Sequence, residues 1–526
     1  MKGEIKMKKR SIIAVMLSAV TMVSLSTGCN KEADDGSTKV SMLLSDSASA
    51  PFNEEWQVLK EIKEKKNVVL DVQVVPASEY ATKRSVVMAS GEIPDILTNT
   101  WANQVGQYAL DGIMLPVSDY LDKMPNLKKI ITDWKLEETI EDITEMDGKF
   151  YVLPSFEKEP AATNTFGIRK DVFEKHNIPY PETYEDLFNA LVKLKELYPE
   201  TLGIGDLYNG KLLLSFVASS FGTKGGYSLP YGYCYNYDKK EWYFAPTSEE
   251  YKKLLTYLNR LYNAGCIDPE AFTQDSGQFK QKVLNEKYFV VPTFNQTSAD
   301  NYAMELNGLG NTDAEFEVLY PLAGPDGIRK GKPCGRYSGG LAMPSSVAER
   351  KDVDKVLDFV DWLYYSEEAA LMSTIGIEGL TYTKDADGYA INSNILTVNN
   401  PSGTKDLMKE FGFGTHGFAT LVSENVPEGV RELVLPKDEL ERKKHIIEND
   451  MVDKDDPTIK FTQEQSEKAK LLYTSLNDYT NTMIVKFIYG EESLENWDAY
   501  VEKCRNLGSD ELIELVNKAW HENNKK

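Results

Sequence analysis

The sequence predicts an α/β protein whose last third is mostly helical. Strand-like and helix-like segments alternate along residues 39–98, and a second series of the same kind runs along residues 165–292. Strands and helices that alternate over such short intervals are typical of parallel βαβ units. From residue 462 onward, capping residues and apolar residues at helical spacing predict helices alone. A chain of 526 residues has room for two or three domains of roughly 100–200 residues each.

The first α/β segment contains the clearest alternation. Trp56, Leu59 and Ile62 lie three residues apart, so they fall on one face of a helix. Gly91 is typical of the position after a helix, because glycine adopts the left-handed conformation at little cost. We expect strands over residues 39–44, 68–75 and 94–98, and helices over residues 54–65 and 80–90.

The later elements are placed mainly by the signals at their ends. Thr183 with Asp186, and Thr462 with Gln465, have the spacing of a capping box, in which each side chain bonds the other residue's backbone N–H. We expect strands over residues 165–169 and 288–292. We also expect helices that begin at Thr183, Ser248, Thr462, Ser493 and Ser509, with ends at Gly265 and Gly508 for the second and fourth of them.

The N-terminus has the features of an export signal. Lys8-Lys9-Arg10 precedes an apolar run over residues 12–25, and small residues follow up to Cys29. This segment resembles a bacterial lipobox, in which the cysteine after the cleavage site is acylated and becomes the mature N-terminus. The usual leucine of that motif lies one position early here, at Leu25. An ordinary secretory signal that is cut elsewhere, with Cys29 incidental, is the alternative.

We therefore expect residues 1–28 to be a lipoprotein signal peptide and residues 29–38 a flexible tether. Met7 is an alternative start, because Met7 to Arg10 already makes a complete basic region. Acyl chains on Cys29 would hold the protein at the outer face of the cytoplasmic membrane, since stable anchoring takes about two chains or signals. A tethered protein of this kind suggests a single-membrane, Gram-positive-type cell.

Composition excludes several classes of partner. The net charge is −23, and a strongly acidic protein is a poor ligand for nucleic acid or anionic lipid, because phosphate binding needs clustered Lys and Arg. Beyond Cys29 the chain has four cysteines without CxxC spacing, and we expect buried free thiols. One disulfide among Cys234, Cys266 and Cys334 is the alternative. The four are Cys234, Cys266, Cys334 and Cys504.

Six short motifs resemble those of one protein family, and they occur in the family's order. The chain is similar to extracellular solute-binding proteins of family 1, in their long, LipO-like branch, which are substrate-binding lipoproteins of carbohydrate ABC importers. The motifs are SGEIPDI at 90–96, DGKFYVLP at 147–154, FGIRKD at 166–171 with residues 179–187 behind it, YNAGCIDPE at 262–270, GIEGLTY at 376–382 and NWDAY at 496–500.

The resemblance implies a periplasmic-binding-protein-like fold, with two α/β lobes, a hinge and a central ligand cleft. It implies a monomer that captures an oligosaccharide and delivers it to a membrane-embedded ABC permease, with no cofactor and no catalysis. We expect hinge crossings near residues 155–163, 292–296 and 340–345. Lobe 1 would then comprise residues 39–156 and 294–341, and lobe 2 would comprise residues 160–293 and 342–526.

The ligand-binding residues are expected where strands end. In open α/β sheets, ligands bind at the carboxyl ends of the strands. Aromatic faces there would cover the apolar face of a sugar, and carboxylates, amides and guanidinium groups would pair its hydroxyls. A run of tyrosines at 227–235 would extend the cleft wall. The predicted binding residues are Ser45, Asp46, Asn99, Trp101, Ser155, Phe156, Arg169, Phe294, Asn295, Tyr337 and Glu378.

Other chemistries receive little support from the sequence. There is no HExxH zinc motif, no GxSxG nucleophile elbow and no phosphate-binding loop. Acidic turns at 385–388 and 450–456 are expected to be solvated rather than metal sites. Two alternatives to an oligosaccharide receptor remain: a lipid-anchored enzyme that cleaves carbohydrate with paired carboxylates, and a receptor for a peptide or another solute.

Overall fold

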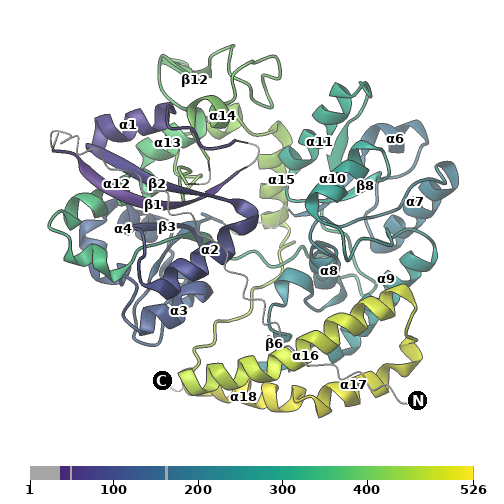
Figure 1. Ribbon diagram of the computed structural model, residues 1–526. Helices are drawn as coiled ribbons and strands as arrows, with labels where there is room; N and C mark the ends of the chain where they lie inside the picture. The colour runs from purple at the N-terminus through teal and green to yellow at the C-terminus, as the bar shows by residue number, and fades with distance from the viewer. Residues whose placement is uncertain (1–35, 48–49, 160–163, 416, 525–526) are drawn as a thin grey trace, which may run out of the picture. The chain divides into compact units, whose positions relative to one another are not determined.

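The computed structural model describes residues 36–47, 50–159, 164–415 and 417–524 (Figure 1). The predicted signal peptide, Cys29 and most of the predicted tether lie outside these residues. From Thr38 onward the chain forms one compact unit. That unit contains two separate sheets, each with its own hydrophobic core, which we call lobe 1 and lobe 2.

The sheet of lobe 1 is built from β1 (Thr38–Asp46), β2 (Val68–Pro76), β3 (Ile96–Thr100), β4 (Val152–Phe156) and β10 (Tyr337–Ala342). Its strand order is β2-β1-β3-β10-β4. β1 is parallel to β2 and β3, whereas β10 is antiparallel to both β3 and β4. β1, β3 and β4 therefore point the same way, and their carboxyl ends lie along one edge with the start of β10. We call this the carboxyl edge of lobe 1.

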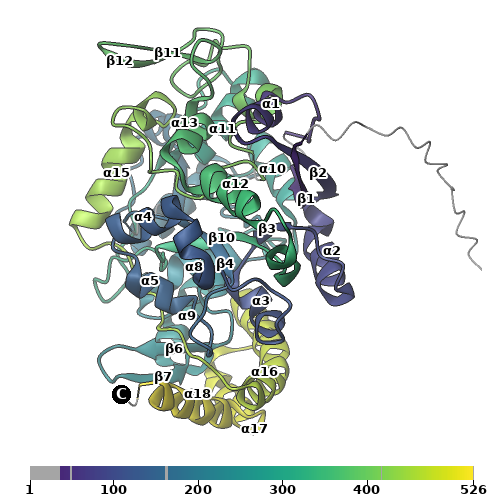
Figure 2. The ribbon, with the colours of Figure 1, turned by 90° about the vertical axis from the view of Figure 1, so that its left-hand side faces the viewer.

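Helices cover both faces of this sheet (Figures 1 and 2). Along β1, Met42 and Leu44 face one helical layer and Leu43 faces the other, as expected for a strand with both faces buried. The first layer contains α1 (Gln57–Lys66), α4 (Pro125–Asp133) and α12 (Val353–Tyr365), and the second contains α2 (Ala77–Ser90) and α3 (Ala102–Leu110). Further elements from the same stretches of chain are α5 (Glu137–Asp142), α13 (Glu367–Ile375), α14 (Leu407–Phe411) and the hairpin of β11 (Tyr382–Asp385) with β12 (Gly388–Ile391).

The sheet of lobe 2 contains β5 (Thr165–Arg169), β8 (Val290–Thr293) and β9 (Phe316–Val318), with β5 antiparallel to both neighbours. A separate two-stranded hairpin joins β6 (Tyr233–Asn236) and β7 (Glu241–Phe244). The surrounding helices are α6 (Lys170–Lys175), α7 (Tyr184–Leu197), α8 (Lys211–Ala218), α9 (Glu249–Asn263), α10 (Ser276–Leu284) and α11 (Gln296–Gly308).

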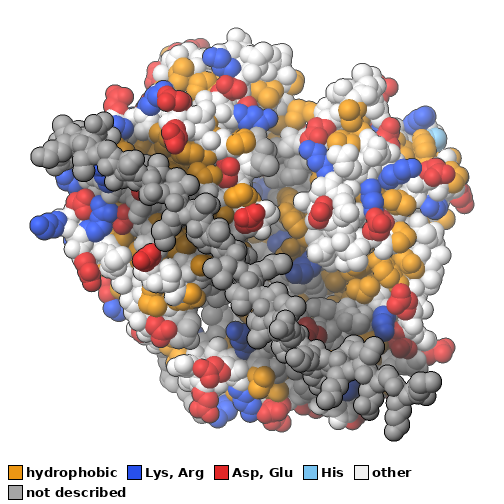
Figure 3. Space-filling model, in the orientation of Figure 1, with side chains coloured by type: hydrophobic (Ala, Val, Ile, Leu, Met, Phe, Trp, Pro, Cys, Tyr) orange, Lys and Arg blue, Asp and Glu red, His pale blue; other side chains and the backbone are white. Residues whose placement is uncertain are grey.

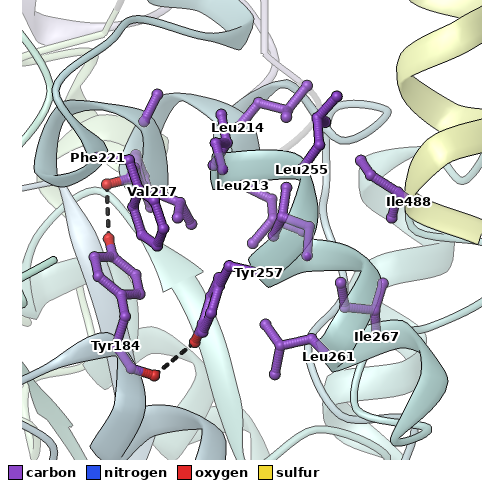
Figure 4. Close-up of a cluster of buried hydrophobic side chains, with 14 of the residues drawn as sticks. Tyr184, Leu213, Leu214, Val217, Phe221, Leu255, Tyr257, Leu261, Ile267 and Ile488 are labelled. Atoms are coloured by element: carbon purple, nitrogen blue, oxygen red, sulfur yellow. Dashed lines mark hydrogen bonds between the residues drawn. The ribbon is translucent and has the colours of Figure 1, made fainter. Parts of the chain in front are cut away.

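The core of lobe 2 combines apolar packing with satisfied polar groups (Figure 4). The Tyr184 hydroxyl donates to the carbonyl of Phe216 at 2.8 Å, and the Tyr257 hydroxyl donates to the carbonyl of Tyr184 at 2.8 Å. Both tyrosines therefore bury their rings without an unpaired hydroxyl, which would cost about 1–3 kcal/mol. Leu213 from α8 and Ile488 from the C-terminal part lie in the same cluster.

The C-terminal helices complete lobe 2. They are α16 (Gln463–Tyr489), α17 (Trp497–Asn506) and α18 (Ser509–Asn523), drawn yellow in Figure 1. Asn259 on α9 donates to the carbonyl of Phe487 at 2.9 Å, and Asn517 on α18 bonds both backbone groups of Trp242 on β7. Ile484, Tyr500 and Leu512 from the three helices share the lobe 2 core.

One helix, α15 (Lys437–Glu448), contacts both lobes. Arg442 pairs with Glu317 on β9 at 3.0 Å, so the helix is bound to lobe 2. On the other side, Lys443 pairs with Glu424 at 2.8 Å and with Glu157, directly after β4, at 3.3 Å. Figure 1 shows α15 between the elements of the two lobes. We call the group of Glu157, Glu424 and Lys443 the hinge ion cluster.

Most predicted elements are confirmed, and the end signals were the most accurate part. The capping boxes at Thr183 and Thr462 are formed as expected. Gly91 follows α2 with a φ of 76°. In lobe 1 the first strands are parallel, whereas in lobe 2 β5 has antiparallel neighbours instead of the βαβ arrangement expected there.

The predicted lobe boundaries are partly wrong. Residues 294–318 were assigned to lobe 1, but α11 and β9 pack against β5 and β8 of lobe 2. Residues 343–422 were assigned to lobe 2, but α12 and the segment around Phe418 bury their apolar side chains in the lobe 1 core. The chain therefore returns to lobe 1 between β9 and β10, rather than near 292–296, and does not leave it again at 340–345. The crossing expected near 155–163 does fall between β4 and β5.

Candidate functional site

The carboxyl edge of lobe 1 holds several of the predicted binding residues. Asp46 ends β1, and its Oδ1 accepts hydrogen bonds from the backbone N–H groups of Ser47 at 3.0 Å and Phe52 at 2.9 Å. These bonds fix the carboxylate in the loop after the strand. Ser45 is buried, and its N–H donates to the Thr98 hydroxyl. Asp46 is half-buried, so its side chain, unlike that of Ser45, is accessible to a ligand.

Trp101 follows β3 and presents an aromatic surface at the same edge. Its side chain is 39% exposed, although a tryptophan is usually well buried. The indole lies against the backbone of Gly339 on β10: a Cβ atom built on that glycine would be 2.3 Å from Trp101 Cε2. Its backbone is held by the Gln104 side chain, which accepts the Trp101 N–H at 3.1 Å. The ring is therefore supported from one side and open to solvent on the other.

Asn99, the second-last residue of β3, is exposed and has a φ of 48°. Asparagine tolerates this left-handed conformation better than most residues. Beneath it, the guanidinium of Arg84 on α2 donates from Nη1 to the Asn99 carbonyl. Arg84 was not predicted as a site residue, because a basic residue in the middle of a helix usually lies on the solvated face of that helix. Only the strand order reveals that it lies under the edge.

β4 and β10 contribute less than expected. Ser155 donates to the carbonyl of Leu421 at 3.1 Å and so ties β4 to a neighbouring loop. Tyr337, opposite Phe156 in the sheet, is half-buried, and burial raises its pKa to about 12, with smaller contributions from Asp142 and Asp455. Phe156 is only 1% exposed and packs on Tyr365, so the prediction of a ligand contact is corrected: this ring belongs to the core.

Lobe 2 presents its own aromatic surface after β8. Phe294 is 36% exposed, and its ring centroid lies 6.3 Å from that of Tyr208. Tyr208 is 6.0 Å from Tyr227, and both tyrosines are exposed. The ammonium group of Lys211 lies 5.4 Å from the Tyr227 ring. We call Tyr208, Tyr227 and Phe294 the lobe 2 aromatic cluster. Tyr227 was predicted to line the cleft, whereas Tyr208 was missed.

One local signal in the sequence indicates that Tyr208 is exposed. It belongs to an Asp-x-Tyr-Asn-Gly turn, and Asp206 accepts the backbone N–H groups of both Tyr208 and Leu213. This tight turn leaves the ring outside the core. Asn295, next to Phe294, instead caps α11 by accepting the N–H of Ser298 at 2.8 Å. Its side-chain oxygen is thereby occupied.

Two of the predicted polar residues, Arg169 and Glu378, make no described hydrogen bond or ion pair with the carboxyl edge of lobe 1. Arg169 is 1% exposed and pairs with Asp171 at 2.7 Å and Glu286 at 3.2 Å, so the structure corrects its role from ligand contact to buried ion pair. Glu378 is exposed in the turn between α13 and β11. Within the described residues, no hydrogen bond or ion pair joins it to the carboxyl edge of lobe 1.

The hinge ion cluster has opposite effects on its two carboxyl groups. Burial raises the pKa of Glu157 above its ordinary value, and the nearby Lys443 only partly compensates. Burial acts in the same direction on Glu424. There, however, the charge and hydrogen bond of Lys443, the N–H of Lys158 and the charge of Arg431 hold the pKa below its ordinary value. Glu424 is therefore the more firmly ionised partner of the cluster.

Figure 3 shows the surface hollowed between the elements of lobe 1, at left, and those of lobe 2, at right, with Lys and Arg side chains visible in the hollow. A separate pocket of about 610 Å³ lies on lobe 2, between the start of α7 and the side of α9. Its charged rim is internally paired, as in Arg260 with Glu185 and Lys253 with Asp326. None of the predicted binding residues lines it.

The described residues give no indication of a metal site or of a reactive thiol. In the part of the chain that the structure describes, no group of three or more potential metal ligands lies together. Cys234, Cys266 and Cys504 are buried without a disulfide, and burial raises the pKa of the Cys266 thiol to about 11. Nor is any helix of the described residues long and apolar enough to cross a membrane.

Two α/β lobes with polar and aromatic residues at their strand ends define a periplasmic solute-binding fold. The model of the family described as bacterial extracellular solute-binding protein matches residues 44–370, and the chain belongs to this family.

Curated relatives and solved structures agree with this assignment. Lipoprotein LipO of Bacillus subtilis (strain 168) is 26% identical over 475 residues, which cover 88% of each chain. The fructooligosaccharide ABC transporter substrate-binding protein FusA of Streptococcus pneumoniae is 24% identical over 473 residues, or 84% of this chain and 82% of FusA.

The crystal structure of FusA in complex with kestose has a TM-score of 0.69 at 21% identity, covering 92% of this chain and 99% of that one. The alginate-binding protein AlgQ2 has a TM-score of 0.70 at 15% identity, covering 92% and 98%.

Proposed function

We propose that this protein is the substrate receptor of a carbohydrate ABC importer, and that it captures an oligosaccharide between its two lobes. It would hand the sugar to a membrane-embedded permease while remaining anchored through acyl chains on Cys29. In this proposal the protein itself catalyses nothing, and the transporter's own ATPase supplies the energy. FusA, whose structure was solved in complex with kestose, and the alginate-binding protein AlgQ2 support the oligosaccharide class.

The observation that carries the proposal is the exposure of aromatic faces at both strand edges. Trp101 and the lobe 2 aromatic cluster are exposed although their rings are large and apolar. Sugars have an apolar C–H face that such rings cover, which removes area from water at about 25 cal/mol per Å². Closure about the hinge would bring the two aromatic surfaces onto one bound chain.

Polar side chains around these rings form the rest of the proposed site. Asp46 and Asn99 on lobe 1 are proposed to pair sugar hydroxyls, with Tyr337 beside them. On lobe 2 the Tyr208 and Tyr227 hydroxyls and the Lys211 ammonium group are proposed to do the same. Ser45, Ser155 and Asn295 are proposed to hold the loops in place, since each already has a backbone partner.

A thermal-shift screen of the mature protein against neutral and acidic oligosaccharides, peptides and polyols tests the proposal. A ligand at about 100 times its Kd should stabilise the folded state by about 2.7 kcal/mol. Stabilisation by peptides alone, or release of shortened sugars during incubation, would contradict it.

The same preparation, made in a Gram-positive host, tests the anchor by intact mass: a diacylated Cys29 is expected, and cleavage at another residue would contradict the anchor.

A further inference from the structure

Arg84 on α2 is a buried cation without a counter-charge in the described part of the chain. The residue is only 5% exposed. Its guanidinium makes one hydrogen bond, from Nη1 to the Asn99 carbonyl, and lies 5.6 Å from the centre of the Tyr80 ring. Nε is buried and has no hydrogen-bond partner among the residues that the structure describes. Among the described residues no carboxylate lies within ion-pairing distance of Arg84.

Other buried arginines of this protein are neutralised. Arg169 is paired with Asp171 and Glu286, and Arg442 is paired with Glu317. Buried charges are normally paired, because an unpaired charge loses its hydration without compensation. In agreement, burial lowers the pKa of Arg84, and only the Tyr80 hydroxyl opposes this shift. The protein is acidic, with a net charge of −23, yet none of its described carboxylates is paired with Arg84.

The position of Arg84 relates it to the proposed binding site. Its one hydrogen bond goes to Asn99, which is exposed at the carboxyl edge of lobe 1. Trp101, with its open indole face, is two residues further along. A sugar ring that lay flat on this indole would direct its ring substituents sideways, along the strand end whose Asn99 carbonyl Arg84 binds. Because Arg84 is only 5% exposed, a carboxylate reaches its guanidinium only if the residues around the Asn99 carbonyl move aside on binding.

We propose that Arg84 binds the carboxylate of an acidic sugar, a uronic acid residue of the oligosaccharide that stacks on Trp101. This inference rests on the proposed function and narrows its substrate class. The planar guanidinium matches a planar carboxylate and forms charge-assisted hydrogen bonds, which are about twice as strong as neutral ones. The ligand would supply the counter-charge that the protein lacks, and the unpaired Nε would gain an acceptor.

The test compares a uronate oligosaccharide with its neutral form. Isothermal titration calorimetry measures the affinity of the wild-type protein for trigalacturonate and for its methyl ester, which has the same ring but no charge. We expect the acid to bind at least tenfold more tightly. In Arg84→Met, which keeps the apolar stem, this ratio should fall close to one. In Arg84→Lys, which keeps the charge but loses the planar guanidinium, the ratio should lie between those of wild type and Arg84→Met.

Arg260→Met is the matched control, because Arg260 is an exposed arginine on the pocket rim of lobe 2. It should leave the ratio unchanged. If the Met variant does not fold, the wild-type ratio and the Lys variant still decide. Equal binding of acid and ester, or an unchanged ratio in Arg84→Met, would overturn the inference, as would preference for a sulfated sugar over the uronate. Tight binding of neutral sugars alone would overturn only the role of Arg84, whereas failure of every oligosaccharide would overturn the proposed function as well.

Discussion

The contact between Gly339 and Trp101 predicts that one methyl group, placed outside the sugar site, will weaken sugar binding. A Cβ atom on Gly339 would lie 2.3 Å from Cε2 and 2.6 Å from both Cδ2 and Cζ2 of the indole. Real Cβ atoms do not approach other atoms this closely, so the indole of Gly339→Ala must leave its support. The indole is attached to a loop and is 39% exposed, so it can move without disrupting the sheet.

The size of the effect follows from the area that the indole offers. A tryptophan side chain has roughly 250 Å² of surface, of which the exposed 39% is about 100 Å². A sugar that covers half of this area removes about 50 Å² from water, and full coverage removes about 100 Å². At about 25 cal/mol per Å², these areas are worth about 1.2 to 2.5 kcal/mol, or roughly 8- to 70-fold in Kd.

The assay is the calorimetric Kd for the best oligosaccharide from the screen, measured on Gly339→Ala, Trp101→Ala and the double variant. Both single variants should lose affinity within the stated range, and the double variant should lose little more, because the two changes remove the same contact. Gly308→Ala is the control, since a Cβ atom there meets nothing within 4 Å. Full affinity in Gly339→Ala with a folded protein, or additive losses in the double variant, would refute the reasoning.

Two further predictions concern stability rather than binding. Because the pKa of Glu424 is held below its ordinary value, Glu424 stabilises the fold above the unfolded pKa of about 4.3, and this contribution is lost as the pH falls below it. Glu424→Gln should therefore lower Tm at pH 7 and bring the variant closer to wild type at pH 3.5; a constant gap in Tm across this range would contradict the assignment. Phe156→Ala should cost about 3–5 kcal/mol in urea unfolding, because the ring is fully buried, yet leave Kd within about twofold. A large loss of affinity in a folded Phe156→Ala protein would return this ring to the site.

Local signals predicted the elements well, because each is encoded by neighbouring residues. The Thr183 and Thr462 capping boxes depend only on residues three positions apart, and the helix end at Gly91 depends on a single φ angle. The rule that ligands meet strand carboxyl ends likewise indicated Asp46, Asn99 and Trp101, which the sheet does bring to one edge.

The remaining features depend on pairings between distant residues. Sequence alone does not show that β10 enters between β3 and β4, and the lobe boundaries were misplaced for this reason. Nor does it distinguish the surroundings of Arg84, in the middle of an expected helix, from those of Arg169, at the end of an expected strand. Only the packing shows which one has carboxylates beside it. Phe156 was misjudged because alternation along a short strand does not reveal which side chains a distant helix covers.

The position of β10 also constrains the order in which the protein can fold. β4 pairs with β10 alone in the sheet, and about 180 residues separate them, among them β5, β8 and β9 of lobe 2. Lobe 2 in turn lacks part of its core until residues 463–523 arrive. Lobe 1 therefore cannot be completed before its residues up to Val422 are available, and lobe 2 cannot be completed before residues 463–523 are available. Loop closure over such separations is slow, so we expect both lobes to finish folding late, and lobe 2 to depend on the last residues of the chain.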